Sequence, residues 1–182
     1  RNLAEARAPG YLDTPHGRVA LIAATAAYRP WNKAGEQRPD IKGRPGINPL
    51  GFRTTYAVDS RAFQELRRMS REFGFDLAKE RNRRHFYSAK EIPDEKETEI
   101  DFLGHRFVLD ESFSISTKPN LRDVDENLKW IREARRQADW VVVSLHCHEF
   151  GGKSLLKART RTQLEEIADF VPGFAHEAID AG

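Results

Sequence analysis

Two continuous runs of apolar residues, 18–25 and 140–146, give the strongest local signals along the chain. Turn-forming residues precede the first run, and a strongly amphipathic segment precedes the second. Short unbroken apolar runs of this kind are typical of strands that are covered on both faces of a sheet. We therefore predict two central, parallel strands, and we expect Tyr11 and Leu12 to form a hairpin with the first of them.

A spacing of three to four residues between apolar side chains predicts three helices. Residues 120–138 have one apolar face and begin at Asn120, a residue type that caps helices, so this helix is expected to pack on the strand that follows it. A second helix is predicted over residues 59–74. A third is predicted over residues 162–181, with a kink at residues 171–173, where a proline and a glycine interrupt the pattern.

The remaining segments complete an α/β architecture. Residues 26–52 are rich in proline and glycine and follow no regular period, which predicts a long loop. Residues 98–110 contain two alternating arms around a short turn, which predicts a β-hairpin inserted at the edge of a sheet. Together the elements predict one partial domain over residues 1–182, with no second domain. It would be part of a layered α/β sandwich.

Composition and charge argue against several classes of protein. The 30 basic residues nearly balance the 28 acidic ones and give a net charge of +2, whereas a dedicated nucleic-acid binder carries a larger or more localised excess. Residues 61–84 are locally basic, which is typical either of a solvated helix face or of an anion-binding patch. No apolar run approaches the roughly 20 residues that span a bilayer. We therefore expect no nucleic-acid partner and no membrane segment in this chain.

A cluster of chemically active side chains lies at the end of the second apolar run. His146 and His148 are two positions apart, so on an extended chain both imidazoles point to the same side. Imidazole is a common metal ligand and a general acid or base near neutral pH, and α/β proteins bind ligands at the carboxyl ends of strands. Both histidines are therefore candidate catalytic residues. The alternative is that they only form hydrogen bonds at a strand end.

The single cysteine, Cys147, lies between these two histidines and excludes a disulfide within the chain. Alternation along the strand places its side chain on the side opposite to the histidines. We expect Cys147 to be a small buried apolar residue and not a nucleophile or a ligand.

Several stretches resemble one known family of bacterial proteins. Residues 137–146, Gln-Ala-Asp-Trp-Val-Val-Val-Ser-Leu-His, and residues 174–182, Phe-Ala-His-Glu-Ala-Ile-Asp-Ala-Gly, are similar to the CapA family of capsule synthesis, or poly-gamma-glutamate biosynthesis, proteins. Residues 10–23 and 43–50 also resemble the middle region of that family. The resemblance implies a fold like that of the calcineurin-like metallophosphoesterases.

The resemblance also implies a metal site. The family's Ser-x-His motif is present as Ser144-Leu145-His146, which gives His146 the role of a ligand to divalent transition metal ions, two of them in the full-length protein. The family's other motifs, an initial Gly-Asp, an Asn-x-Glu, an Asn-Asn-His and a Gly-His-x-x-His, do not accompany it. A catalytic metal site needs at least three protein ligands, and no other histidine or carboxylate stands at metal-ligand spacing. We therefore expect a fragment whose site is completed by residues outside it.

Two functions fit these features. The first is a metal-dependent, phosphoesterase-like hydrolase that acts on an anionic polymer or a phosphate ester. In it, the loop of residues 26–52 packs over the carboxyl end of the first strand, and Arg44 and Asn48 bind the anionic substrate within reach of His146. The alternative is a non-catalytic component of capsule assembly or export, in which Arg29, Arg38, Arg44 and Arg53 bind an anionic polymer.

Overall fold

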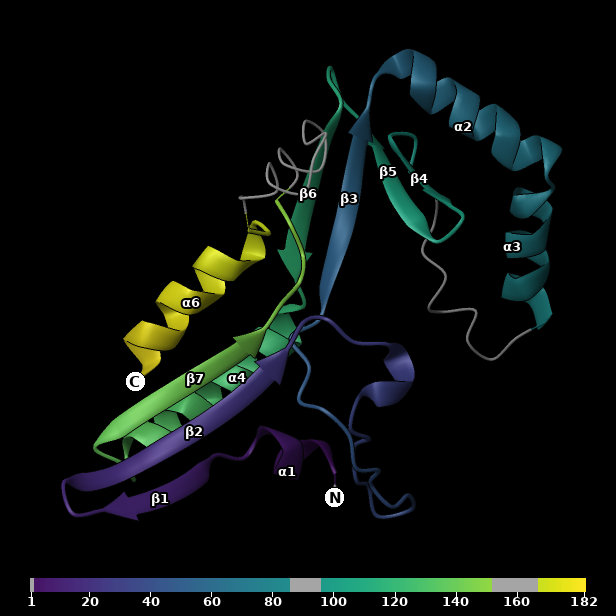
Figure 1. Cartoon of the computed structure of the whole chain (residues 1–182). Helices are drawn as coiled ribbons and strands as arrows, with labels where there is room; N and C mark the ends of the chain where they lie inside the picture. The colour runs from purple at the N-terminus through teal and green to yellow at the C-terminus, as the bar shows by residue number, and fades with distance from the viewer. Residues whose placement is uncertain (1, 86–95, 152–166) are drawn as a thin grey trace.

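The computed structural model describes residues 2–85, 96–151 and 167–182, which form two sheets with helices packed against them (Figure 1). In chain order the elements are α1 (Leu3–Arg7), β1 (Gly10–Thr14), β2 (Gly17–Thr25), η1 (Pro30–Asn32), β3 (Phe52–Val58), α2 (Ser60–Glu72), α3 (Phe75–His85), β4 (Glu99–Phe102), β5 (His105–Leu109), β6 (Ser114–Pro119), α4 (Leu121–Arg135), β7 (Trp140–His146) and α6 (Phe170–Ala181). This mixture of helices and strands confirms the predicted α/β class. None of the helices in these ranges has the length and apolar character needed to cross a membrane.

The first sheet has three strands in the order β1-β2-β7. β1 and β2 form an antiparallel hairpin, closed at Gly17, whose φ of +128° is a conformation that residues with a side chain rarely adopt. β2 and β7 run parallel, with Val19 opposite Trp140 and Thr25 opposite His146. The hairpin and the parallel pairing of the two apolar runs are therefore confirmed.

The prediction that both apolar strands are central and covered on both faces is wrong, because β7 is not central and neither β2 nor β7 is covered on both faces. Among the described residues β7 lies at the edge of the sheet, and β2 lies between two strands. Side chains of β7 alternate between half-buried and exposed, and on the outer face Val142 is 48% exposed beside its partner Leu21, which is 50% exposed. The described helices pack on the opposite face only, so the apolar residues of the outer face remain accessible to water.

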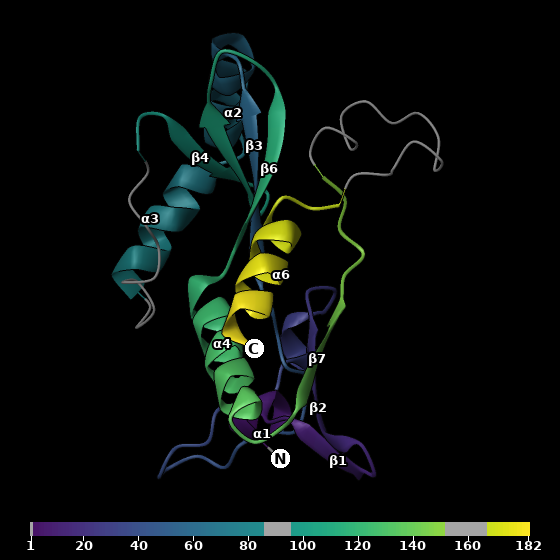
Figure 2. The same ribbon diagram turned by 90° about the vertical axis from the view of Figure 1, so that its left-hand side faces the viewer.

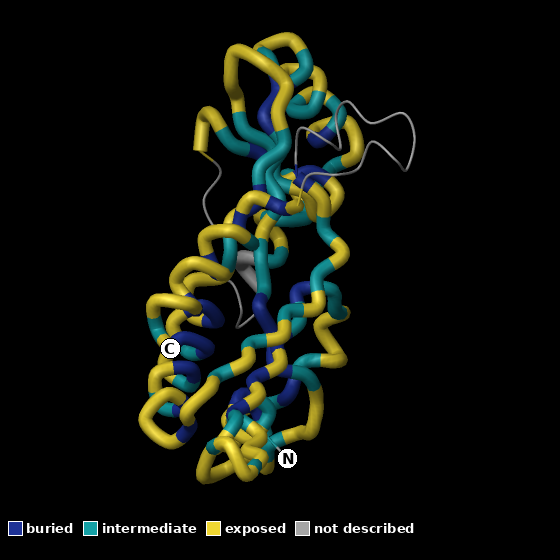
Figure 3. Tube along the Cα trace, turned by 60° about the vertical axis from the view of Figure 1, so that its left-hand side comes forward, coloured by how far each residue is buried: buried dark blue, intermediate teal, exposed yellow. Residues whose placement is uncertain are grey.

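The inner face of this sheet is covered by α4 and α6 (Figure 2). Asn120 caps α4 by accepting a hydrogen bond from the backbone N–H of Asp123 at 3.2 Å. Ile131 of α4 and Ile22 of β2 are fully buried between the layers, and buried positions line the space between helix and sheet (Figure 3). The predicted amphipathic helix and its packing on the strand are confirmed.

The last helix differs from its prediction at its start. It begins at Phe170, while residues 167–169 are not helical and residues 152–166, where the helix was expected to begin, lie outside the described residues. Pro172 and Gly173 therefore fall in the first turn of α6 and do not interrupt a longer helix. Proline is tolerated in a first turn because the backbone N–H that it lacks has no helical acceptor there, so the predicted kink is wrong.

The second sheet has four strands in the order β4-β5-β3-β6, with α2 packed against it. Asp59 caps α2 by accepting from the N–H of Ala62 at 2.8 Å, as expected for the predicted helix. The predicted hairpin is present as β4 and β5, but β5 also pairs in parallel with β3, so the hairpin is half of a sheet. The buried core here is small and consists of Val58, Phe63 and Ile100.

Two neighbouring strands of the four-stranded sheet, β3 and β6, connect it to the elements of the first sheet. They pair with each other along their length (Figure 1). The rings of Phe52 and Phe170 stack at 4.9 Å between centroids, which connects β3 to α6. The backbone N–H of Thr117 in β6 donates to Asp169 Oδ2 at 2.9 Å, just before α6. One aromatic stack and one charged hydrogen bond therefore link the four-stranded sheet to the helices of the first sheet.

Candidate functional site

The two predicted catalytic histidines meet at the carboxyl end of β7. The ring centroids of His146 and His148 are 4.4 Å apart, and the ring planes are perpendicular. Both residues are exposed, and neither imidazole makes a hydrogen bond within the described part of the chain. The backbone carbonyl of His146 accepts from the N–H of Ala26 at 2.9 Å, so the pair lies directly beside the carboxyl end of β2. This is the edge at which α/β sheets bind ligands.

The residues around the pair reduce the reactivity of Cys147. Its thiol donates a hydrogen bond to Glu149 Oε2 at 3.0 Å, and the same oxygen accepts from the N–H of His148 at 3.0 Å. Burial, followed by this hydrogen bond, raises the pKa of Cys147 to about 11. The thiol therefore stays protonated near neutral pH. Cys147 contacts the core, but it is half-buried and not fully buried as expected.

The described residues do not complete a metal site around the histidines. In the three described ranges no group of three or more histidine, cysteine, aspartate or glutamate side chains is placed to hold a metal ion. The two imidazoles fit a metal by their donor chemistry, because both are exposed and form a close pair. They supply at most two of the three or more ligands that a catalytic site needs.

Asn48 lies beneath the surface at the end of the loop of residues 26–52. Its backbone carbonyl accepts from the N–H of Thr25 at 3.0 Å, and its Nδ2 donates to the Ala23 carbonyl at 3.0 Å and to Asn127 Oδ1 at 2.7 Å. Asn48 is only 4% exposed. These contacts hold the end of the loop against the carboxyl end of β2, as expected. They also mean that the amide nitrogen of Asn48 already donates two hydrogen bonds within the protein. A substrate role for Asn48 stays a prediction.

Arg44 occupies a different part of the same loop. Its guanidinium donates to the Lys33 carbonyl at 2.8 Å, and its backbone pairs with Gly35, whose carbonyl accepts from the N–H of Leu3 in α1 at 2.9 Å. The loop therefore turns back from β2 toward α1 (Figure 1). Arg44 is exposed, and no contact within the described residues joins it to His146. Its proposed role in binding substrate remains a prediction.

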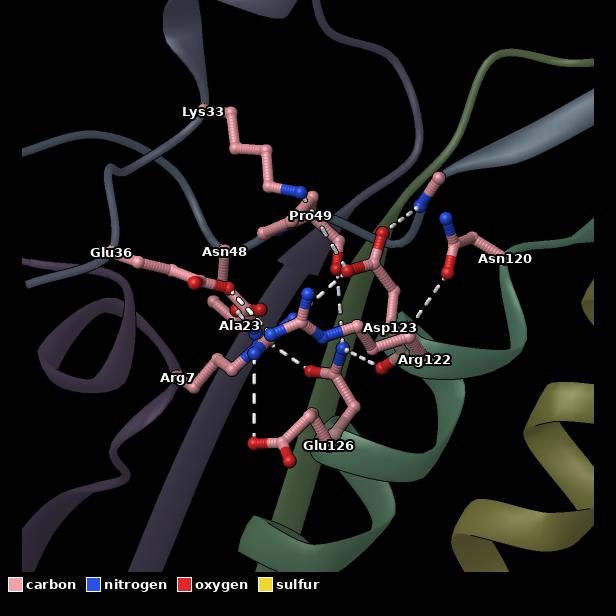
Figure 4. Close-up of polar contacts among 12 residues, drawn as sticks. Arg7, Ala23, Lys33, Glu36, Asn48, Pro49, Asn120, Arg122, Asp123 and Glu126 are labelled. Carbon is pink, nitrogen blue, oxygen red and sulfur yellow. Dashed lines mark hydrogen bonds and ion pairs between the residues drawn. The ribbon is translucent and has the colours of Figure 1, made fainter. Parts of the chain in front are cut away.

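A buried polar network lies behind this loop and was not expected from the sequence (Figure 4). Arg7 of α1 and Asp123 of α4 form an ion pair at 2.9 Å, and their side chains are 5% and 3% exposed. Asp123 also accepts from the N–H of Gly51 at 3.0 Å, and Asn127 donates to the Pro49 carbonyl at 3.2 Å. The side chain of Asp123 in α4 thus contacts both α1 and the end of the loop.

Gly51 is a point of close approach in this network. A Cβ atom at residue 51 would lie 2.9 Å from Tyr28 Oη and 3.0 Å from Asp123 Oδ2, so any larger residue would displace one of them. Burial, followed by the charge of Asp123, raises the pKa of Tyr28. The only sequence signal for the network is that Asp123 and Asn127, four residues apart, interrupt the apolar face of the helix.

Comparison with known proteins gives relatives but no family. No family model matches the chain. Two proteins of Sinorhizobium fredii (strain NBRC 101917 / NGR234), the uncharacterized proteins y4sH and y4uA, are each 26% identical to it over 179 residues. The match covers 98% of this chain and 34% of each relative, so the chain spans about a third of their length. The names of these relatives state no activity.

Proposed function

We propose that this chain belongs to a CapA-like protein of capsule or poly-gamma-glutamate biosynthesis, and that its activity is that of a metal-dependent, phosphoesterase-like hydrolase. The observation that carries the proposal is the perpendicular pair of exposed imidazoles, His146 and His148, at the carboxyl end of β7. The parallel pairing of β7 with β2 supports it, because ligands of α/β proteins bind where parallel strands end.

In this proposal the two histidines have related roles. His146 holds a divalent transition metal ion, and His148 acts as a second ligand or as the acid that protonates the leaving group. A metal bound there would lower the pKa of a bound water and attract the oxyanions of a phosphate or carboxylate ester. Cys147 takes no part, because its raised pKa keeps the thiol protonated.

The second candidate is a protein that binds an anionic polymer without hydrolysing it. The exposed guanidinium of Arg44, at the surface of the loop of residues 26–52, favours it. In that case metal is not required, and Arg44 matters more than the histidines. Metal content therefore separates the two candidates.

The test is elemental analysis of the intact protein and of two single variants. We expect His146→Ala to lose the transition metal and to keep its fold, because the side chain is exposed and makes no hydrogen bond among the described residues. The matched control is His16→Ala, at the turn that joins β1 to β2, the end of β2 remote from Thr25. Its metal content should stay at the wild-type level. Unchanged metal content in His146→Ala would refute the hydrolase and leave the polymer-binding candidate.

A further inference from the structure

A cationic groove lies where the four-stranded sheet meets the start of α4. Its volume is about 600 Å³, a size typical of sites for small ligands. Four of its lining side chains are basic: Arg53, Arg106, Lys118 and Arg122. None of the described residues that line it is acidic. We call this the cationic groove below.

Two of the basic residues are direct neighbours across strands. Arg53 of β3 lies opposite Lys118 of β6 in the antiparallel register, and both side chains are exposed. Like charges in this position destabilise a sheet, whereas an opposite charge between them would remove the repulsion. In the described ranges neither side chain forms an ion pair. The repulsion is therefore left without compensation by this part of the protein.

The other two basic residues have ion-pair partners outside the groove. Arg106 pairs with Glu99 at 2.8 Å, and Arg122 pairs with Glu36 at 2.8 Å. The Nε of Arg106 is nevertheless buried without a hydrogen-bond partner among the described residues. An unsatisfied buried donor on a charged group is costly. Because this atom has almost no exposed surface, a ligand in the groove does not reach it as the side chain lies, and the observation that points to an anion is the uncompensated pair of Arg53 and Lys118.

The end of the groove nearest the first sheet adds two features that favour an anion. Tyr28 lines it, and a phenol, whose ordinary pKa is near 10, is a hydrogen-bond donor at neutral pH. The positive end of the α4 dipole, at Asn120, also lies there. The charge of Asp123 acts in the opposite sense, because it contributes to the raised pKa of Tyr28, so the attraction for an anion comes from the four basic side chains.

We propose that the cationic groove binds a ligand with two neighbouring anionic groups, phosphates or carboxylates, held between Arg53 and Lys118 with Arg106 at its side. Guanidinium groups form paired hydrogen bonds with both kinds of oxyanion, so the shared chemistry is that of a di-anionic ligand. The groove needs no metal ion. The proposal therefore goes beyond the function proposed for the histidines and does not depend on it.

The experiment is calorimetric titration of the intact, metal-free protein with two probes, inorganic pyrophosphate and a triglutamate peptide. Arg53→Gln and Lys118→Gln are each expected to raise the dissociation constant about tenfold or more, as for the loss of one charged hydrogen bond. Lys129→Gln is the matched control, because it removes the same charge from an exposed position on α4 that does not line the groove. It should change the dissociation constant less than about twofold, because salt screens the effect of a distant, exposed charge.

Two further measurements separate a binding role from a structural one. Because Arg53 and Lys118 repel each other, either substitution should leave the thermal midpoint unchanged or raise it while affinity falls. His146→Ala should bind both probes as the wild type does, which distinguishes this site from the histidine pair. A preference for one probe identifies the ligand as a phosphate or a carboxylate, and either preference supports the groove.

The proposal is overturned by three results. The wild type could fail to bind both probes at millimolar concentration. Lys129→Gln could weaken binding as much as the groove variants do, which would mean that only net charge matters. Finally, the groove variants could lose affinity only in proportion to a loss of folded protein, which the thermal midpoint would reveal.

Discussion

The two sheets of this protein differ in how much apolar surface they bury. Among the described residues, fourteen buried ones from β2, α4, α6 and adjoining segments form the core beneath the three-stranded sheet, whereas three form the core of the four-stranded sheet. Hydrophobic burial is the main source of folding free energy, so most of the stability resides in the first region. The second region has a smaller core and also carries the cationic groove.

The pairing of charges follows a similar division, although Arg7 Nε and Asn48 Oδ1 in the first region are buried without a hydrogen-bond partner among the described residues. Beneath the three-stranded sheet, the buried charge of Asp123 is matched by Arg7 and by the N–H of Gly51. On the four-stranded sheet, Arg53 and Lys118 face each other without an acidic partner in the described residues. A buried charge with an opposite partner is compatible with a stable fold, whereas like charges that face each other are relieved when a ligand of opposite charge lies between them. The first region therefore contributes most of the stability, and the second carries the proposed binding groove.

The largest expected effect comes from breaking the buried ion pair. Asp123→Ala leaves the guanidinium of Arg7 buried with Glu126, at 3.6 Å, as its one remaining acidic partner among the described residues. Removing one member of a buried pair typically costs about 3–5 kcal/mol of unfolding free energy. Urea denaturation monitored by circular dichroism measures the loss.

Asp125→Ala is the control for this prediction, because Asp125 is exposed on the same helix. Its effect should stay within about 0.5 kcal/mol, as for most surface substitutions. If Asp123→Ala lowers the free energy of unfolding no more than this control does, the buried network does not stabilise the first region. The proposed difference between the two regions would then be wrong for the polar groups.

The next prediction compares the same substitution in the two cores. Ile131 in α4 is 0% exposed and Ile100 in β4 is 2% exposed, so both lose the same buried atoms on mutation to alanine. We expect about 4 kcal/mol for Ile131→Ala and about 2 kcal/mol for Ile100→Ala. The difference arises because helix and sheet surround Ile131, whereas Ile100 lies in an edge strand whose neighbours can close the cavity. Equal losses in denaturant titrations would show that the two cores are packed alike.

The sequence predicts the first region better than the second for a physical reason. β2, α4 and β7 have continuous or periodic apolar residues because each buries at least one face in the larger core. β3 and β6 do not, since Arg53 and Lys118 lie on the face that lines the groove. A strand with a polar face and a small core has no apolar run to reveal it. Both strands were missed, although the hairpin beside them was predicted.

The residues of the candidate site also differ in how well the sequence predicts their roles. The exposed pair of His146 and His148 follows from local alternation at the end of an apolar strand, so the sequence is enough to find it. The partner of Asp123 is Arg7, 116 positions away, and no local pattern indicates such a pairing. Asn48 was predicted from its position in the loop, but its amide makes contacts that only the tertiary structure reveals.

The smallest expected effect is a titration at the junction of the two regions. Burial, followed by the charge of Asp123, raises the pKa of Tyr28 above its ordinary value near 10, so the protonated phenol is favoured in the folded state. Its contribution to stability is fully present below the unfolded pKa and is lost as the pH rises through the higher folded pKa. The affected window is therefore alkaline, and stability at neutral pH is unchanged by it.

Asp123→Asn removes the second of these two causes and leaves the first. The pKa of Tyr28 should fall part of the way toward its ordinary value, because burial of the ring persists. Phenolate absorbance measures the titration, and subtracting the curve of a Tyr28→Phe variant isolates this tyrosine from the others. If the pKa of Tyr28 is the same in Asp123→Asn as in the wild type, Arg7 neutralises the charge of Asp123, and that charge has no effect on Tyr28. The buried network would then stabilise the first region without affecting the electrostatics of the second.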